Sequence, residues 1–300
     1  MGRDTTLWEQ GRSLSFHLYD DWVFHYVFSQ DTEDSRNALM AVLNIVLNRE
    51  RDPITEIILL NPINYKEVME GKETTLDIKA TASTGEIIDI EMQRSDFKHY
   101  EKRSLYYAGK LIGSSLEGGE KYDTMKKSIV ISFINGKIYD DIPEVHNIFW
   151  LRDNRYNRLL TDRLEIHFIE LGKVNCRKRA EEMTPVEKLA VYLKYAGDMR
   201  RREYVRDIIE AGGEAFQMVE KVFKEVTDDE RIREMYWRKE VYEHDQATWR
   251  AIYEERGELR GESRFSQLTA ILLEKGRLED LKRCTEDPDY KESLYRQLGI

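Results

Sequence analysis

Three polar residues in two neighbouring segments have types and spacing that suit metal-dependent chemistry. Asp77 lies in one short run of strand-forming residues, and Glu91 and Gln93 lie in the next. Ser83-Thr84-Gly85 separates the two runs and favours a hairpin, which brings Asp77 and Glu91 together. Side chains alternate along a strand, so Glu91 and Gln93 share a face. Carboxylates gathered on one sheet face are too costly to be packing residues, and they indicate a Mg²⁺ or Mn²⁺ site for phosphodiester chemistry.

The neighbours of Glu91 extend this prediction. Met92 is expected to point to the opposite face and pack in the core, with its backbone carbonyl available to the metal. Asp89 alternates with Glu91, so it either joins the same face or is solvated. Gln93 can orient a water molecule by hydrogen bonding, but it carries no charge.

Basic residues follow the acidic segment directly and could contact phosphate groups. Arg94 comes first, and Arg103, Tyr106, Tyr107 and Lys110 then recur at helical spacing, which predicts one shared face. We expect DNA contacts from Arg94, Arg103, Tyr107 and Lys110. The competing interpretation is that the helical residues simply cover the sheet.

The elements that must position these residues alternate between helix and strand. Helices are predicted over residues 17–30, 34–48 and 97–117, the last ended by Gly118-Gly119, and strands over 54–60, 74–82, 87–93, 127–134 and 164–171. The fold class is therefore α/β, with a mixed sheet flanked by helices.

The C-terminal part of the chain has a different character. Thr184-Pro185-Val186-Glu187 is a typical helix start, and the following sequence is charged and helical in pattern. We expect a catalytic domain over residues 1–175 and a helical accessory region over residues 176–300, for DNA binding or self-association.

Composition narrows the setting in which the protein works. The chain has 300 residues, of which 41% are hydrophobic, and a net charge of −10. This negative total weakens the expectation of a nucleic-acid partner, although local basic clusters such as Arg200-Arg201-Arg202 remain. No apolar run approaches the roughly 20 residues of a membrane span, and the residues before the predicted domain are not expected to act as a secretory signal. Cys176 and Cys284 are far apart in the sequence, so a cytoplasmic location without disulfides or membrane contact is expected.

The order and spacing of these motifs resemble the PD-(D/E)XK nuclease superfamily, and within it the recombination-promoting nuclease / putative transposase family. The resemblance covers residues 18–135 well. It rests on the segments Asp21-Trp22-Val23-Phe24-His25-Tyr26-Val27-Phe28, Leu43-Asn44-Ile45-Val46-Leu47, Leu76-Asp77-Ile78, Ile90-Glu91-Met92-Gln93, Arg103-Ser104-Leu105-Tyr106-Tyr107-Ala108-Gly109-Lys110-Leu111 and Ser128-Ile129-Val130-Ile131.

The resemblance implies a restriction-endonuclease-like core that cuts DNA with a divalent metal. By position, Asp77 and Glu91 match the two central metal ligands, and Asp21 matches an acid on the first helix that completes the metal shell. An acid favoured by the helix dipole is an equally good interpretation of Asp21. Gln93 stands where the superfamily usually has lysine and this family typically has glutamine. His25 departs from the family pattern, in which lysine is common.

Two functions follow from these observations. The first is a Mg²⁺- or Mn²⁺-dependent DNA endonuclease associated with recombination or mobile elements, acting as a possible homodimer because a double-strand cut needs two active sites. The alternative is a catalytically degenerate relative that binds DNA or a protein, which the neutral Gln93 and the acidic net charge keep open.

Overall fold

The protein is described by a computed structural model that covers residues 15–61, 77–94, 97–116 and 118–300. Residues 74–76 of the predicted strand and residue 117 of the predicted helix lie outside these ranges. The chain divides into two compact units, Met1–Glu234 and Met235–Ile300.

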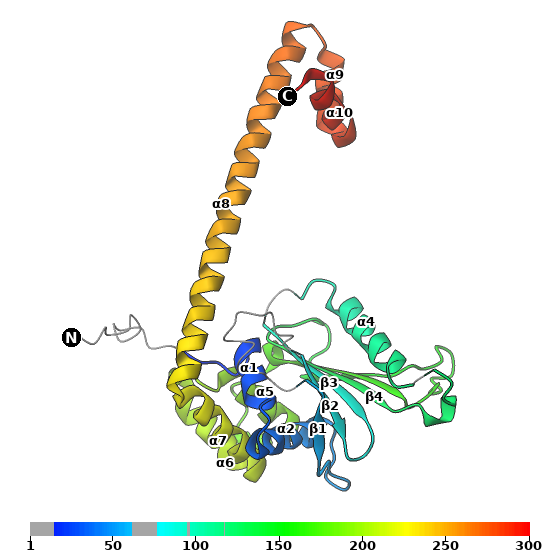
Figure 1. Ribbon diagram of the computed structural model, residues 1–300, viewed down its shortest axis with the longest axis vertical. Helices are drawn as coiled ribbons and strands as arrows, with labels where there is room; N and C mark the ends of the chain where they lie inside the picture. Colours follow the sequence, from blue (N-terminus) through cyan, green and yellow to red (C-terminus); the bar gives the residue numbers. More distant parts are fainter. Residues whose placement is uncertain (1–14, 62–76, 95–96, 117) are drawn as a thin grey trace, which may run out of the picture. The chain divides into compact units, whose positions relative to one another are not determined.

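A six-stranded mixed sheet forms the centre of the first unit (Figure 1). Its strands are β1 (Ile57–Leu59), β2 (Ile78–Ala82), β3 (Ile87–Gln93), β4 (Ser128–Ile134), β5 (His146–Phe149) and β6 (Leu164–Glu170), in the spatial order β1-β2-β3-β4-β6-β5. The pairs β3–β4 and β4–β6 are parallel, and the remaining neighbours are antiparallel. The predicted α/β class with a mixed sheet is confirmed.

The hairpin from β2 to β3 forms as the sequence predicts. Gly85 adopts φ 94° in the turn, a conformation that favours glycine because it has no Cβ. The register pairs Ile78 with Ile90 and Lys79 with Asp89. This register fixes which side chains of the two strands share a face.

Helix α4 (Tyr100–Gly113) covers one face of the sheet (Figure 1). Its residues Ala108 and Leu111 pack on Val130 of β4 and Leu164 of β6. The helix ends at Gly113, before the end of the predicted span of 97–117. The hydroxyls of Ser114 and Ser115 bond back to the carbonyls of Leu111 and Ile112, which satisfies the last turn and ends the helix.

Helices α1 (Asp21–Phe28) and α2 (Glu33–Val46) lie on the opposite face of the sheet (Figure 1). The ring of Phe24 packs on that of Phe133, with centroids 5.5 Å apart. The first helix lies within the predicted span of 17–30 but starts only at Asp21, because the carboxylate of Asp20 caps it by accepting hydrogen bonds from the amides of Trp22 and Val23.

Strand β5 is an element that the sequence pattern did not predict. It is short and half-exposed, and it pairs with β6 at the edge of the sheet. His146 of β5 and His167 of β6 have ring nitrogens 2.9 Å apart. A strand with so little burial has no clear alternation of apolar and polar residues.

Helices α5 (Pro185–Tyr195), α6 (Arg202–Gly212) and α7 (Glu214–Asp228) complete the first unit, where α2 contacts both α5 and α7. The start of α5 confirms the predicted cap. The amide of Glu187 donates to the hydroxyl of Thr184 at 3.2 Å, and the amide of Thr184 donates to the Glu187 carboxylate at 2.8 Å.

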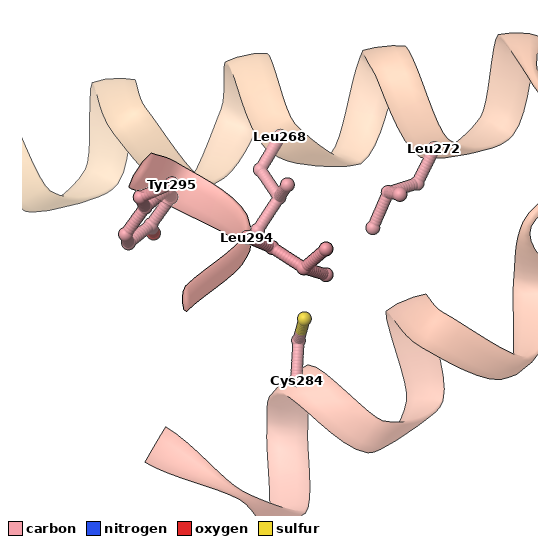
Figure 2. Close-up of a cluster of buried hydrophobic side chains, with 5 residues drawn as sticks. All are labelled: Leu268, Leu272, Cys284, Leu294 and Tyr295. Atoms are coloured by element: carbon pink, nitrogen blue, oxygen red, sulfur yellow. The ribbon is translucent and has the colours of Figure 1, made fainter. Parts of the chain in front are cut away.

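The second unit is helical and has its own small core (Figure 2). It contains most of α8 (Glu230–Glu274), together with α9 (Leu278–Glu286) and α10 (Pro288–Leu298). The core residues come from all three helices and are Leu268, Leu272, Cys284, Leu294 and Tyr295. Among the described residues, no helix combines the length and the apolar character that crossing a membrane requires.

Candidate active site

A cleft of about 890 Å³ lies between the β2–β3 face of the sheet and helix α4. Every residue predicted for the site lines it except Arg94. The residues that line it are Asp21, Leu60, Asp77, Lys79, Ile87, Asp89, Glu91, Met92, Gln93, Arg103, Tyr107, Lys110, Leu111 and Ser114. The fold therefore gathers side chains from a helix end, two strands and a second helix around one cavity.

Asp77 occupies a different position from the one that the sequence predicts. It lies just before β2 rather than midway along a strand. Strand β1 ends at Leu59, and beyond it the side-chain amide of Asn61 makes hydrogen bonds to the backbone around the start of β2. This amide donates to the Asp77 carbonyl and accepts from the Lys79 amide, both at 2.7 Å.

The acidic residues of the hairpin share the cleft face. Ile78 pairs with Ile90, so continuing the register by one residue sets Asp77 opposite Glu91. Asp89 and Glu91 alternate with buried isoleucines on β3, and both acids are themselves buried. The alternative that Asp89 is solvated is therefore wrong, and Asp89 belongs to the cleft.

Burial and mutual repulsion perturb these acids. Burial, together with the charges of Asp77 and Glu91, raises the pKa of Asp89 to about 7. Burial also raises the pKa of Glu91, against the opposing effects of Tyr100 and Arg103. Asp77 Oδ1 and Asp89 Oδ1 are buried and have no hydrogen-bond partner among the described residues. Clustered acids with unsatisfied oxygens in a cleft are typical of sites that bind a cation or a substrate.

Two polar side chains hold the acids in position from either side. The Tyr100 hydroxyl donates to Glu91 Oε2 at 2.9 Å, and Lys79 Nζ lies 2.8 Å from Asp77 Oδ2. The hydrogen bond that Lys79 donates to Asp77 is the main reason that the pKa of Lys79 is raised. Neither Tyr100 nor Lys79 was predicted as a site residue. The period of two along β2 could have identified Lys79, whereas nothing in the sequence pairs Tyr100 with Glu91.

The α4 wall of the cleft is cationic. Arg103 donates to the Tyr107 hydroxyl at 2.8 Å and to Gln93 Oε1 at 3.2 Å, and its Nη2 lies 3.9 Å from Glu91 Oε2. Lys110 lines the cleft from the same helix. Tyr106 does not line the cleft: it is exposed, although its ring lies 5.6 Å from Lys110 Nζ.

Arg94 and Asp21 lie at the margin of this arrangement. Arg94 Nη1 pairs with Asp20 Oδ2 at 2.8 Å, so its guanidinium is held against the capping residue of α1. Asp21 lines the cleft, and its Oδ1 accepts a hydrogen bond from the amide of Trp22 at 2.9 Å. His25, in the next turn of α1, is buried, and burial lowers its pKa to about 4.

The donor set of the cleft suits a divalent cation with oxygen ligands. Within the ranges that the structure describes, no three or more His, Cys, Asp or Glu side chains are grouped as a ready-made metal cage. Mg²⁺ commonly uses only one or two carboxylates and keeps several waters. The unsatisfied oxygens of Asp77 and Asp89, with Glu91 beside them, fit that requirement.

Comparison with known proteins agrees with this geometry. A model of the PD-(D/E)XK nuclease family transposases matches residues 18–251, a span that includes the whole sheet and every residue that lines the cleft. No curated protein and no solved structure matches the chain. Because the match extends over most of the sequence, this chain belongs to the PD-(D/E)XK nuclease family of transposases.

Proposed function

We propose that this protein is a divalent-metal-dependent DNA endonuclease that hydrolyses phosphodiester bonds in recombination or mobile-element movement. Its family supports a nuclease function and an association with mobile elements. One observation carries the proposal: Asp77 Oδ1 and Asp89 Oδ1 are buried beside Glu91 without a partner among the described residues, in a cleft whose opposite wall is cationic.

The acidic side of the cleft would hold the metal. Asp77 and Glu91 are the proposed central ligands of Mg²⁺ or Mn²⁺, and Asp21 and the Met92 carbonyl are the proposed completing ligands, with Asp89 adding negative charge. When bound, such an ion lowers the pKa of a water molecule and neutralises charge that develops on the phosphate.

The remaining cleft residues would bind and orient the DNA. Arg103, which Tyr107 and Gln93 hold in place, offers a planar set of donors to a phosphate group, and Lys110 adds a second cation. Gln93 is a neutral hydrogen-bonding group suited to orienting the attacking water.

The reaction is a displacement at phosphorus. The water oxygen forms a bond to phosphorus while the bond from phosphorus to one deoxyribose oxygen breaks. The electron pair stays on the leaving oxygen, which takes a proton from water, and the attacking water loses its proton to solvent. The products are one strand end with a phosphate group and one with a hydroxyl group.

The helices beyond the sheet have a proposed accessory role. We assign residues 176–300 to DNA binding or self-association, since a symmetric dimer would bring the two active sites that a double-strand cut requires. Light scattering of the purified protein with and without duplex DNA tests this role. A monomer under both conditions would contradict the dimer.

Incubation with supercoiled plasmid tests the proposed activity. Wild-type protein with Mg²⁺ or Mn²⁺ should nick or linearise the plasmid, EDTA should stop the reaction, and Asp77→Ala should abolish it. Cleavage that survives Asp77→Ala would contradict the site. Absence of cleavage with either metal, together with retained DNA or protein binding, would favour a degenerate binding protein.

A further inference from the structure

The sheet side of the cleft carries a lysine that has no part in the proposed metal site. Lys79 of β2 lines the cleft and lies directly opposite Asp89 in the register of the hairpin. Its ammonium contacts Asp77, and its side chain remains 42% exposed. Lys79 therefore projects from the same face as the acidic residues and is open to a ligand.

The strand that carries the central acid of the motif supplies no cation of its own. Gln93 lies two residues after Glu91 and is neutral, so it cannot offset negative charge on a phosphate group. Lys79 reaches the same face from the neighbouring strand. A lysine ammonium is a compact charge with three donors, suited to a phosphate oxygen.

A purely structural role explains Lys79 poorly. An ion pair with a partly exposed lysine contributes little to stability, about 0–1 kcal/mol. Of the two Asp77 oxygens, Oδ2 contacts Lys79 while Oδ1 stays buried without a partner among the described residues. Exchanging the carboxylate for a phosphate oxygen would keep Lys79 in a charge-assisted hydrogen bond.

We propose that Lys79 is a catalytic residue, whose ammonium contacts the scissile phosphate and stabilises the negative charge of the transition state that neutral Gln93 cannot. Lys79 keeps its proton throughout and forms no covalent bond. This inference rests on the proposed nuclease function.

Moving the lysine charge from position 79 on β2 to position 93 on β3 tests the inference. The variants are Lys79→Met, Lys79→Arg and the double variant Lys79→Met with Gln93→Lys. Lys127→Met is the matched control, because Lys127 also pairs with a carboxylate, Glu165 at 2.6 Å, but does not line the cleft. The measurements are the single-turnover cleavage rate of a labelled duplex with Mg²⁺, its affinity with Ca²⁺ in place of Mg²⁺, and the melting temperature.

Lys79→Met should slow cleavage by about 100-fold to 1,000-fold, the usual effect of removing one donor to a transition-state charge. Its affinity for the duplex should stay within about threefold of wild type. A merely structural lysine would not lower the cleavage rate so strongly while leaving the affinity unchanged. Lys79→Arg should retain part of the cleavage rate. Adding Gln93→Lys to Lys79→Met should raise the cleavage rate at least tenfold above that of Lys79→Met. Lys127→Met should cleave like wild type.

Two outcomes would overturn the role of Lys79 while leaving the nuclease intact. One is Lys79→Met cleaving within threefold of an active wild type, and the other is a double variant no faster than Lys79→Met. If the melting temperature of Lys79→Met is clearly below that of wild type, Lys79→Gln replaces it under the same criteria. An inactive wild type would instead overturn the proposed function, and this inference with it.

Discussion

The Tyr100 hydroxyl donates a hydrogen bond of 2.9 Å to Glu91 Oε2, so the first turn of α4 fixes the orientation of a carboxylate on β3. The tyrosine is itself held firmly, since it is almost fully buried and its ring lies 5.8 Å from that of Phe168. Groups that orient a metal-binding carboxylate commonly affect metal affinity and activity by about 10-fold to 100-fold.

Replacing Tyr100 by phenylalanine should therefore impair the site without unfolding the protein. We expect cleavage at limiting Mg²⁺ to fall by about 10-fold to 100-fold, with part of the loss recovered at high Mg²⁺. A Mg²⁺ titration of the single-turnover rate measures this effect. Tyr122→Phe is the control, because Tyr122 is 84% exposed and lies outside the cleft. Equal Mg²⁺ dependence for Tyr100→Phe and wild type would contradict the assigned role of Tyr100.

Much of this site could be predicted from the sequence, because strand alternation and a hairpin turn determine which side chains share a face. Asp77, Glu91 and Gln93 reach the cleft for that reason. The contact between Tyr100 and Glu91 could not be predicted, because it depends on how α4 packs on the sheet. The ion pair of Arg94 could not be predicted for a similar reason: its partner Asp20 is distant in sequence.

Adding a divalent metal should stabilise the folded protein. Binding to the native state alone raises the free energy of unfolding by about 2.7 kcal/mol when the ligand is at 100 times its dissociation constant. We expect Mg²⁺ or Mn²⁺ to raise the melting temperature of wild type by several degrees, EDTA to reverse the rise, and Asp77→Asn to lose most of it. A rise of the same size in Asp77→Asn would place the bound metal elsewhere.

Arg103 and Arg94 should affect different properties. Arg103→Gln should weaken duplex binding and lower the slope of log affinity against log salt by about 1, because one phosphate contact is lost. Arg94→Gln should instead lower stability by about 1 kcal/mol, because it leaves the buried Asp20 carboxylate without its ion-pair partner. Salt-dependent anisotropy and urea unfolding separate the two effects. A larger loss of DNA affinity in Arg94→Gln would reverse this assignment.

The histidine pair at the sheet edge should make stability sensitive to mild acid. Burial, together with the charge of His167, lowers the pKa of His146 to about 4. The unfolded chain, with a pKa near 6.5, binds a proton first, so this contribution is complete above pH 6.5 and is lost as the pH falls toward 4. At full size, a pKa difference of this extent corresponds to about 3 kcal/mol of stability.

His146→Gln removes this titration and should flatten the decline of unfolding free energy between pH 6.5 and 4 relative to wild type. His244→Gln serves as the control, because His244 is exposed on α8. Urea unfolding across this pH range provides the comparison. Parallel pH curves for His146→Gln and wild type would show that His146 makes no such contribution.

The acidic face of the hairpin is proposed to form a metal-dependent phosphodiester hydrolysis site, and Glu91→Gln tests this proposal most directly. Glutamine keeps the size of the side chain and an oxygen acceptor for Tyr100, but it removes the charge. In single-turnover cleavage of a labelled duplex with Mg²⁺, wild type should cut and Glu91→Gln should be at least about 100-fold slower. Glu101→Gln, an exposed change on α4 outside the cleft, should cut like wild type. Equal cleavage by Glu91→Gln and wild type, or none by wild type with any divalent metal, would contradict the claim.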